Sequence, residues 1–368
     1  MEYVDEFRDP DLATALVSKI NRTMAGIEKE RKPLQIMEVC GGHTHTLFKY
    51  GIAQLLSDDI DFVHGPGCPV CVLPQKRLDQ VIAIAEQPGT ILCTFGDAMR
   101  VPGSSGSLLD ARARGCDVRM VYSPMDALKL AEQNLQKKVV FFALGFETTM
   151  PATAMTLQAA KCKQVTNFWL FCQHITIMPT LTALLSQDDV RIDGFLLPGH
   201  LSIIIGTKPY QPLADDFHKP CVVTGFEPLD MLQALDMLVD QLKEQRCEIE
   251  NQYSRVVVAD GNSNALQAMA EVFTGKQESE WRGLGNIPHS GVQLTPAYRD
   301  FDAEVHFQPQ ATNQADPQNS RCGDVLAGRC KPTDCPLFGR DCTPDTAVGA
   351  LMVSSEGACA AYYQYNRH

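Results

Sequence analysis

Short apolar runs alternate with longer helix-like patterns along most of the chain, and this alternation constrains the fold more than any other feature. Strands separated by helices are typical of parallel α/β architecture. We therefore predict parallel sheets flanked by helices. Runs rich in β-branched and aromatic residues predict strands at 34–39, 61–64, 90–95, 117–122, 139–144, 168–173, 195–197, 221–224 and 255–259.

Three of these expected strands end in similar corners, in which a glycine is followed by a carboxylate: Gly96-Asp97, Gly145-Phe146-Glu147 and Gly225-Phe226-Glu227. Open α/β sheets bind ligands at the carboxyl ends of their strands, so these corners are candidate cleft residues. Coincidence between glycines at strand ends is the alternative. After Pro228, apolar residues recur at helical spacing over 229–242, which predicts a helix packed in the core or between domains.

The domain organisation follows from where these patterns lie. A chain of 368 residues, at roughly 100–200 residues per domain, suits two or three domains. The expected strands divide almost equally around residue 125, so we predict two similar α/β domains, 1–125 and 126–282, that face a cleft. The stretch 283–319 is rich in Gln, Asn, Pro and Asp and predicts an extended connection within a third region, 283–368, that contains a small cysteine-rich domain.

Composition excludes several classes of partner and site. The 32 basic and 44 acidic residues give a net charge of −12, which disfavours nucleic acid and anionic membranes as partners. The first ten residues contain no signal-peptide pattern, and no apolar run approaches the length of a membrane span. Neither usual nucleotide-phosphate loop is present. We expect a cytoplasmic protein whose cysteines are thiols, metal ligands or redox pairs.

Cys40 closes the first expected strand and begins the motif Cys-Gly-Gly-His-Thr-His. The two glycines allow a bound group to approach the backbone, so the thiol is a candidate ligand or nucleophile. His43 and His45 are close enough in sequence to support a metal or to shift the pKa of the thiol. A buried cysteine at a tight turn, with both histidines as polar capping residues, is an equal alternative.

Cys68 and Cys71 form a Cys-x-x-Cys motif within His-Gly-Pro-Gly-Cys-Pro-Val-Cys. This spacing suits either a dithiol/disulfide pair or half of a four-ligand metal site. A zinc half-site needs a second pair of ligands, and none lies nearby in the sequence. The pattern therefore favours a redox pair.

The C-terminal region is dense in cysteine, since five of the 14 cysteines lie between 322 and 359. Four of them are separated by 13, 7 and 17 positions, which matches neither common ferredoxin pattern. Spacing alone leaves an iron–sulfur cluster and a four-cysteine zinc site open. Metal binding can supply folding free energy to a segment with so little apolar material. The four cysteines are Cys322, Cys335, Cys342 and Cys359.

These motifs together resemble the HypD family, whose members act in the maturation of [NiFe]-hydrogenases. The resemblance covers nearly the whole chain. It rests on the blocks CGGHTH at 40–45, GPGCPVC at 65–71, TFGDAMRVPG at 94–103, GFETTMP at 145–151, LPGH at 197–200 and the tail from CPLFG at 335 to EGACAAYY at 363.

The resemblance implies an accessory scaffold on which the Fe(CN)2(CO) unit is assembled, in complex with a small HypC-type chaperone and with a HypE-type protein as cyanide donor. It also implies two similar α/β domains and a third with a [4Fe–4S] cluster. Soft thiolates suit a low-spin ferrous ion, so Cys40 is the expected iron ligand, shared with a chaperone thiolate. Cys68 and Cys71 are the expected redox pair.

Further residues follow from the same resemblance. His43, Asp97, Glu147 and His200 are expected to line the cleft and to position or protonate incoming groups. The family pattern has a cysteine at the position of Leu351. We expect Cys322, Cys335, Cys342 and Cys359 to be the cluster ligands, while the role of Cys330 and of a second dithiol stays open.

Two competing functions remain. One is a stand-alone thiol–disulfide oxidoreductase that uses Cys68 and Cys71 and has a structural zinc in the tail. The other is an interaction platform whose cysteines only stabilise the fold. Iron content discriminates the first from the scaffold, and the effect of replacing Cys40 discriminates the second.

Overall fold

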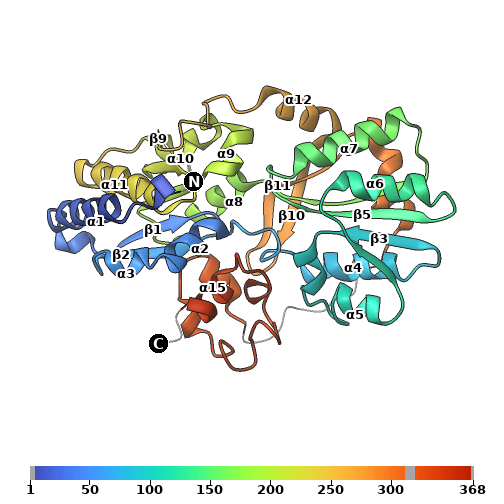
Figure 1. Cartoon of the computed structure of the whole chain (residues 1–368), viewed down its shortest axis with the longest axis horizontal. Helices are drawn as coiled ribbons and strands as arrows, with labels where there is room; N and C mark the ends of the chain where they lie inside the picture. The colour runs from blue at the N-terminus through green and yellow to red at the C-terminus, as the bar shows by residue number, and fades with distance from the viewer. Residues whose placement is uncertain (1–4, 311–319, 366–368) are drawn as a thin grey trace.

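The computed structural model describes residues 5–310 and 320–365, and Figure 1 shows two α/β units side by side. Each unit is built on a parallel sheet, which confirms the predicted fold class. The first sheet has the order β2 (Ile60–His64), β1 (Leu34–Glu38), β7 (Gly194–Pro198), β8 (Cys221–Thr224) and β9 (Ile249–Asn251). The second has the order β4 (Asp117–Met120), β3 (Thr90–Thr94), β5 (Lys138–Gly145) and β6 (Phe168–His174).

The sheets group the strands differently from the domain boundary predicted at residue 125. β1 pairs with both β2 and β7, so the first sheet combines the start of the chain with residues after 190. The second sheet is formed by β3 to β6, on both sides of residue 125. The spacing of strands in the sequence could not reveal this arrangement. When two units are similar in composition, a strand can belong to either sheet without any change in its local sequence pattern.

The expected strand at 255–259 is wrong. The first sheet ends instead at β9, and 252–256 forms turns. Val257 is buried, whereas Val256 and Val258 are exposed. The alternation of these valines resembled a half-buried strand, but residues 255–259 form no strand in the structure, and the carbonyl oxygen of Val257 instead accepts a 2.9 Å hydrogen bond from the Asn251 side chain of β9.

Helices cover the faces of both sheets. Residues 229–242 confirm the prediction of a packed helix, since Leu229, Leu232, Leu235, Leu238 and Leu242 are all buried. The helices are α1 (Pro10–Ala25), α2 (Gly41–Lys49), α3 (Ile52–Leu55), α4 (Gln75–Ala85), α5 (Leu108–Ala113), α6 (Pro124–Gln133), α7 (Met150–Cys162), α8 (Ile177–Leu185), α9 (Gly199–Ile205), α10 (Gln211–Asp215), α11 (Pro228–Glu244), α12 (Ser263–Val272), α13 (Ala303–Phe307), α14 (Cys322–Leu326) and α15 (Ala358–Tyr365).

An antiparallel ribbon of β10 (Phe273–Trp281) and β11 (Gly285–Leu294) lies between the two units (Figure 1). The sequence predicted an extended connection over 283–319, so β11 corrects the first part of that expectation. The ribbon lacks an apolar run because most of β10 is solvent-exposed, with Phe273 and Trp281 buried at its two ends. Residues 311–319 lie outside the described residues.

The C-terminal segment packs against both units. Leu351, Met352 and Cys359 belong to the same buried core as Val63 of the first sheet and Phe142 of the second. The segment therefore extends a shared core. A separate C-terminal cysteine-rich domain stays a prediction. Among the helices that the structure describes, none is long and apolar enough to cross a membrane.

Candidate functional site

Cys40 lies at the carboxyl end of β1, beside the corresponding ends of β2 and β7, where open α/β sheets bind ligands. It caps α2, and its Sγ atom accepts a hydrogen bond of 3.3 Å from the backbone N–H of Gly42. The side chain is buried, with 5% of its surface exposed. Burial and the neighbouring carboxylates of Glu356 and Glu38 hold the pKa of the Cys40 thiol well above its ordinary value. The free protein therefore presents a protonated thiol.

His200 is a titratable neighbour of this thiol. Its Nδ1 atom lies 3.9 Å from Sγ of Cys40. The histidine belongs to α9, which begins immediately after the carboxyl end of β7. Burial lowers the pKa of His200 to about 4, so its imidazole is neutral at pH 7. A neutral ring nitrogen beside a thiol can accept the proton that the thiol loses when it binds a metal.

His43 is fully buried in the first turn of α2, and within 5–310 and 320–365 no group makes a hydrogen bond of good geometry to either ring nitrogen, although the backbone of Thr224 and Gly225 lies nearby. Its ring stacks on Phe226, with ring centroids 4.8 Å apart. Phe226 also contacts the ring of His200, at a centroid separation of 5.1 Å. Burial lowers the pKa of His43 to about 3. One aromatic side chain thus contacts both histidines that the sequence selected.

Gly42 makes this arrangement possible. A Cβ atom at position 42 would lie 2.9 Å from the ring of Phe226, closer than van der Waals contact permits. The glycine therefore allows the Phe226 ring to lie directly against the turn that follows Cys40.

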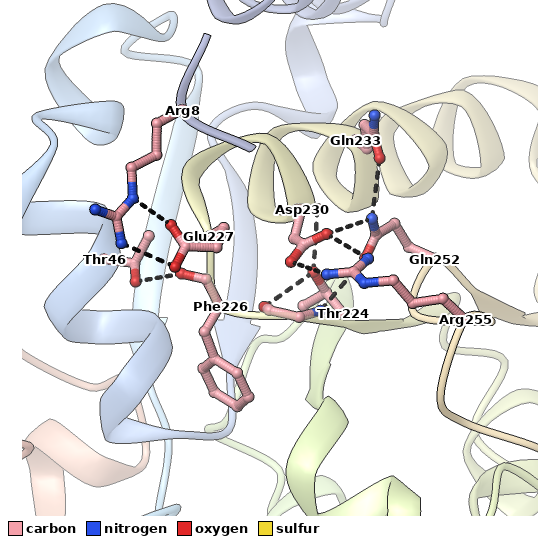
Figure 2. Close-up of polar contacts among 10 residues, drawn as sticks. Arg8, Thr46, Thr224, Phe226, Glu227, Asp230, Gln233, Gln252 and Arg255 are labelled. Carbon is pink, nitrogen blue, oxygen red and sulfur yellow. Dashed lines mark hydrogen bonds and ion pairs between the residues drawn. The ribbon is translucent and has the colours of Figure 1, made fainter. Parts of the chain in front are cut away.

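Hydrogen bonds fix the corner that carries Phe226, as Figure 2 shows. Thr46 Oγ1 of α2 donates a 2.6 Å hydrogen bond to the carbonyl oxygen of Phe226. Arg8 donates to both carboxylate oxygens of Glu227 at 2.6 and 2.9 Å. The carboxylate at this corner, which the sequence suggested as a cleft residue, is therefore paired with the N-terminal segment.

A second ion pair supports the same corner from the other side (Figure 2). The buried Asp230 accepts two hydrogen bonds from Arg255, at 2.8 and 2.7 Å, and one from Gln252 at 2.9 Å. The Gln252 side chain also accepts a hydrogen bond from the backbone N–H of Gly225. These contacts fix the backbone immediately before Phe226.

The Cys68–Cys71 loop follows β2 and lies directly against Cys40. Both loop cysteines are buried free thiols, and the Cys71 N–H donates to Sγ of Cys68 at 3.3 Å. A Cβ atom at Gly67 would lie 2.3 Å from the carbonyl oxygen of Val39 and 2.7 Å from Cα of Cys40. The two cysteine motifs, separated in sequence, are thus adjacent in space.

The C-terminal segment reaches this region through residues 354–357. Ser354 donates a 2.9 Å hydrogen bond to Asp97, and a Cβ atom at Gly41 would lie 2.3 Å from atoms of Glu356. A Cβ atom at Gly357 would lie 3.2 Å from Sγ of Cys71. Burial and the nearby Asp97 raise the pKa of Glu356. Asp97 is therefore brought to the site through the C-terminal segment.

Cys322, Cys335, Cys342 and Cys359 line one pocket, together with apolar side chains that include Leu337, Phe338 and Met352. A Cβ atom at Gly349 would lie 2.5 Å from Sγ of Cys322, so this glycine makes room for the sulfur. The Gly349 N–H also donates to Sγ of Cys342 at 3.5 Å. Cys330 is not among the residues that line the pocket.

Four thiols around one pocket are a donor set that a four-cysteine zinc site and an iron–sulfur cluster both use. A [4Fe–4S] cluster binds each thiolate to a different iron and so suits four cysteines spread around a pocket. The residues present therefore fit the group that the family resemblance implies.

Glu147 is buried away from these contacts. One of its carboxylate oxygens accepts a 3.1 Å hydrogen bond from the N–H of Ile177 at the start of α8, and the other has no partner. Burial raises the pKa of Glu147 to about 7. The structure shows no direct contact between Glu147 and Cys40, so its placement in the cleft stays a prediction.

Sequence reasoning missed three residues at the site: Glu38, Phe226 and Glu356. Phe226 was quoted only as part of a corner. Glu356 begins a block that carried the family resemblance, but no role was assigned to it. Glu38 is the only charged residue of β1, and a charge at the end of a mostly apolar strand was the available signal for a buried functional carboxylate.

Comparison with known proteins finds similar chains over nearly the full length. The family model described as "HypD: Hydrogenase formation hypA family" matches residues 11–366. Hydrogenase maturation factor HypD of Escherichia coli (strain K12) is 59% identical over 368 residues, which cover 100% of this chain and 99% of the relative. The factor of the same name from Rhodobacter capsulatus is 52% identical over 372 residues, covering 99% and 98%. That of Cupriavidus necator is 46% identical over 377 residues, covering 100% and 98%.

Proposed function

Because this chain belongs to the HypD family of hydrogenase maturation factors, we propose that it is the scaffold on which the Fe(CN)2(CO) unit of [NiFe]-hydrogenase is assembled. The observation that carries the proposal is the position of Cys40. Its thiol lies 3.9 Å from the neutral imidazole of His200 and beside the Cys68–Cys71 loop. One soft ligand, one proton acceptor and one dithiol are thus gathered at the same end of a sheet.

Cys40 is the proposed ligand for the iron of the cargo. Thiolates suit low-spin ferrous iron, and a HypC-type chaperone supplies a second thiolate in this scheme. Binding requires loss of the thiol proton, and His200 is the neutral base in contact with it. His43 and Phe226 form an aromatic wall next to the turn. Such a wall excludes water while diatomic ligands are delivered, with a HypE-type protein as the proposed cyanide donor.

Cys68 and Cys71 are the proposed redox pair. The dithiol releases two electrons and two protons when it closes to a disulfide. Cys71 lies next to Gly357, and Gly357 precedes Cys359 of the C-terminal pocket by two positions in the sequence. A [4Fe–4S] cluster on Cys322, Cys335, Cys342 and Cys359 would supply or accept electrons one at a time beside this dithiol.

Anaerobic purification followed by metal analysis tests this proposal against an oxidoreductase with a structural zinc. The scaffold predicts about four irons per chain and no stoichiometric zinc. A colourless protein that contains zinc would contradict it. Replacement of Cys40 by alanine separates the scaffold from a passive interaction platform. We expect hydrogenase maturation to be lost while the iron content is retained, whereas maturation at the wild-type level would contradict the role of Cys40.

A further inference from the structure

Glu38 is a fully buried carboxylate, with 1% of its surface exposed, at the last position of β1. One oxygen accepts a 3.0 Å hydrogen bond from the backbone N–H of Cys40. The other accepts hydrogen bonds from Thr44 Oγ1 and from Nδ1 of His64, the latter at 2.6 Å. A single carboxylate therefore joins the backbone of Cys40, the first turns of α2 and the end of β2.

His64 lies directly opposite Glu38 in the register of β1 and β2. It is 5% exposed and immediately precedes the Cys68–Cys71 loop. The carbonyl oxygen of Glu38 also accepts a 2.9 Å hydrogen bond from the N–H of Gly65. The loop that carries the dithiol is thus attached to the residue that holds Cys40, through both side chain and backbone.

The other edge of His64 contacts the helix that carries Cys359. Its ring packs edge-on against Tyr362 of α15, at a centroid separation of 5.5 Å. Phe48 of α2 contacts both rings, at 5.6 Å from His64 and 4.8 Å from Tyr362. Three sulfur-bearing segments therefore converge on one buried histidine.

We infer that Glu38 and His64 are positioning residues whose hydrogen bond holds the Cys40 turn and the Cys68–Cys71 loop in one fixed arrangement. Closing the Cys68–Cys71 disulfide changes the loop, and the Glu38–His64 contact transmits this change to the backbone of Cys40. The inference concerns geometry in the isolated protein. Only the biological purpose of this coupling rests on the proposed function.

Both partners of this hydrogen bond are buried, and replacing both partners of a buried hydrogen bond by apolar groups of the same shape can be nearly neutral for stability. Replacing such a pair by apolar residues of similar size is often neutral, whereas removing one partner leaves an uncompensated buried group. The double variant Glu38→Leu/His64→Phe is therefore expected to fold. It keeps an aromatic ring against Phe48 and Tyr362 but cannot hold the N–H of Cys40.

The test measures the reactivity of Cys40 in the full-length protein, purified anaerobically. Iodoacetamide alkylation of Cys40 is followed by peptide-resolved mass spectrometry, once with Cys68 and Cys71 reduced and once after mild thiol oxidation closes them. Glu38→Gln is the conservative variant, because its amide still offers an acceptor to the N–H of Cys40 and a donor to His64. Asp79→Asn is the matched control, since Asp79 is a buried carboxylate bonded to Ser104 away from the site.

In the wild type, we expect closure of the pair to change the alkylation rate of Cys40 by about tenfold, the effect of a modest change in local opening. The same ratio is expected in Glu38→Gln and Asp79→Asn. In the double variant the ratio should fall to about one. Circular dichroism checks that each variant is folded. A folded double variant with the wild-type ratio would overturn the inference. A wild type in which Cys40 is alkylated at the same rate in both redox states would also overturn it.

A misfolded double variant does not end the test. Thr44→Val removes one of the other partners of the Glu38 carboxylate and leaves its bond to His64. Coupling should persist in this variant, whereas its loss would overturn the assignment to the Glu38–His64 contact. No hydrogenase or chaperone is present in these assays, so the inference and the scaffold proposal can fail separately.

Discussion

The Sγ atom of Cys40 lies 3.9 Å from Nδ1 of His200, although 160 positions separate the two residues in the sequence. The contact forms because β1 and β7 are neighbours in one sheet and both end at the same edge. His200 is therefore in direct contact with the thiol. In the proposed function, this contact gives the cysteine a proton acceptor from a distant part of the chain.

Replacing His200 by glutamine should separate metal capture from folding. Glutamine is similar in size but is a far weaker base, so the proton lost by Cys40 on metal binding has no acceptor. We expect hydrogenase maturation to fall by about 10- to 100-fold, the usual cost of losing an outer-shell partner of a metal ligand, with the iron content of the C-terminal pocket unchanged. Maturation assays on cell extracts measure the first quantity and metal analysis the second; full maturation would remove His200 from the scheme.

The four pocket cysteines should differ from Cys330. Serine at any one of Cys322, Cys335, Cys342 or Cys359 removes a soft ligand and should lower the iron content well below about four per chain. Cys330→Ser is the matched control and should retain the wild-type content, because Cys330 is not among the pocket-lining residues. Iron loss in the control with retention in Cys342→Ser would show that the ligand set is wrong.

Gly41 tests the contact between the Cys40 turn and the C-terminal segment. A methyl group at this position would lie 2.3 Å from the backbone of Glu356, so Gly41→Ala must displace residues 354–357. Overpacking of this kind typically costs about 1 to 3 kcal/mol of unfolding free energy, and we expect maturation to be impaired as well. Gly275→Ala is the control, because nothing lies within 4 Å of a Cβ atom there. Equal thermal midpoints for both variants would contradict this packing.

The Asp230–Arg255 ion pair, which supports the corner of Phe226, should contribute more to the free energy of unfolding than an ion pair near the surface. Asp230→Ala leaves the Arg255 guanidinium without its carboxylate, while the Gln252 amide keeps its bond to Gln233. The change should cost about 2 to 3 kcal/mol, less than for a fully buried pair because Arg255 is partly exposed. Asp236 pairs with the half-exposed Lys19, which also pairs with Asp240, so Asp236→Ala should cost less than about 1 kcal/mol. Chemical denaturation measures both changes. A cost for Asp236→Ala as large as that for Asp230→Ala would contradict the ranking.

Glu147 predicts a pH dependence of stability. Burial raises its pKa from 4.5 to about 7 in the folded protein, so the folded state binds the proton more tightly than the unfolded state does. Its contribution to stability is complete below pH 4.5 and is lost as the pH rises through about 7, a change of about 3 kcal/mol. Glu147→Gln removes this dependence. The denaturant midpoint should therefore decrease less between pH 5 and pH 8 in the variant than in the wild type. An equal decrease in both proteins would contradict this role of Glu147.

The sequence was most informative where local patterns decide structure. The apolar runs that became β1, β3 and β5 are buried on both faces, and such strands leave a continuous apolar signal. β10 carries no such signal because its middle residues face solvent, so the ribbon was missed. The partner exchange that joins β1 to β7 depends on contacts across the fold and is invisible to residue spacing.

For the same reason, sequence reasoning found some residues of the candidate site and missed others. Cys40, Cys68 and His200 carry chemistry in their side chains and stand at strand ends, so sequence reasoning selected them, and the structure brings all three to one edge of the sheet. Glu38 and Glu356 act through partners far away in the sequence. Their significance follows only from contacts with His64 and with the Cys40 turn.

An infrared spectrum of the protein, co-purified from hydrogenase-maturing cells with the proposed HypC-type chaperone, tests the central claim most directly. Cyanide and carbonyl ligands absorb in a region that is nearly free of other protein bands. The account predicts both kinds of band in the wild type and their loss in Cys40→Ala, with the iron of the C-terminal pocket retained. Absence of the bands from the wild type, or their persistence at full intensity in Cys40→Ala, would contradict it.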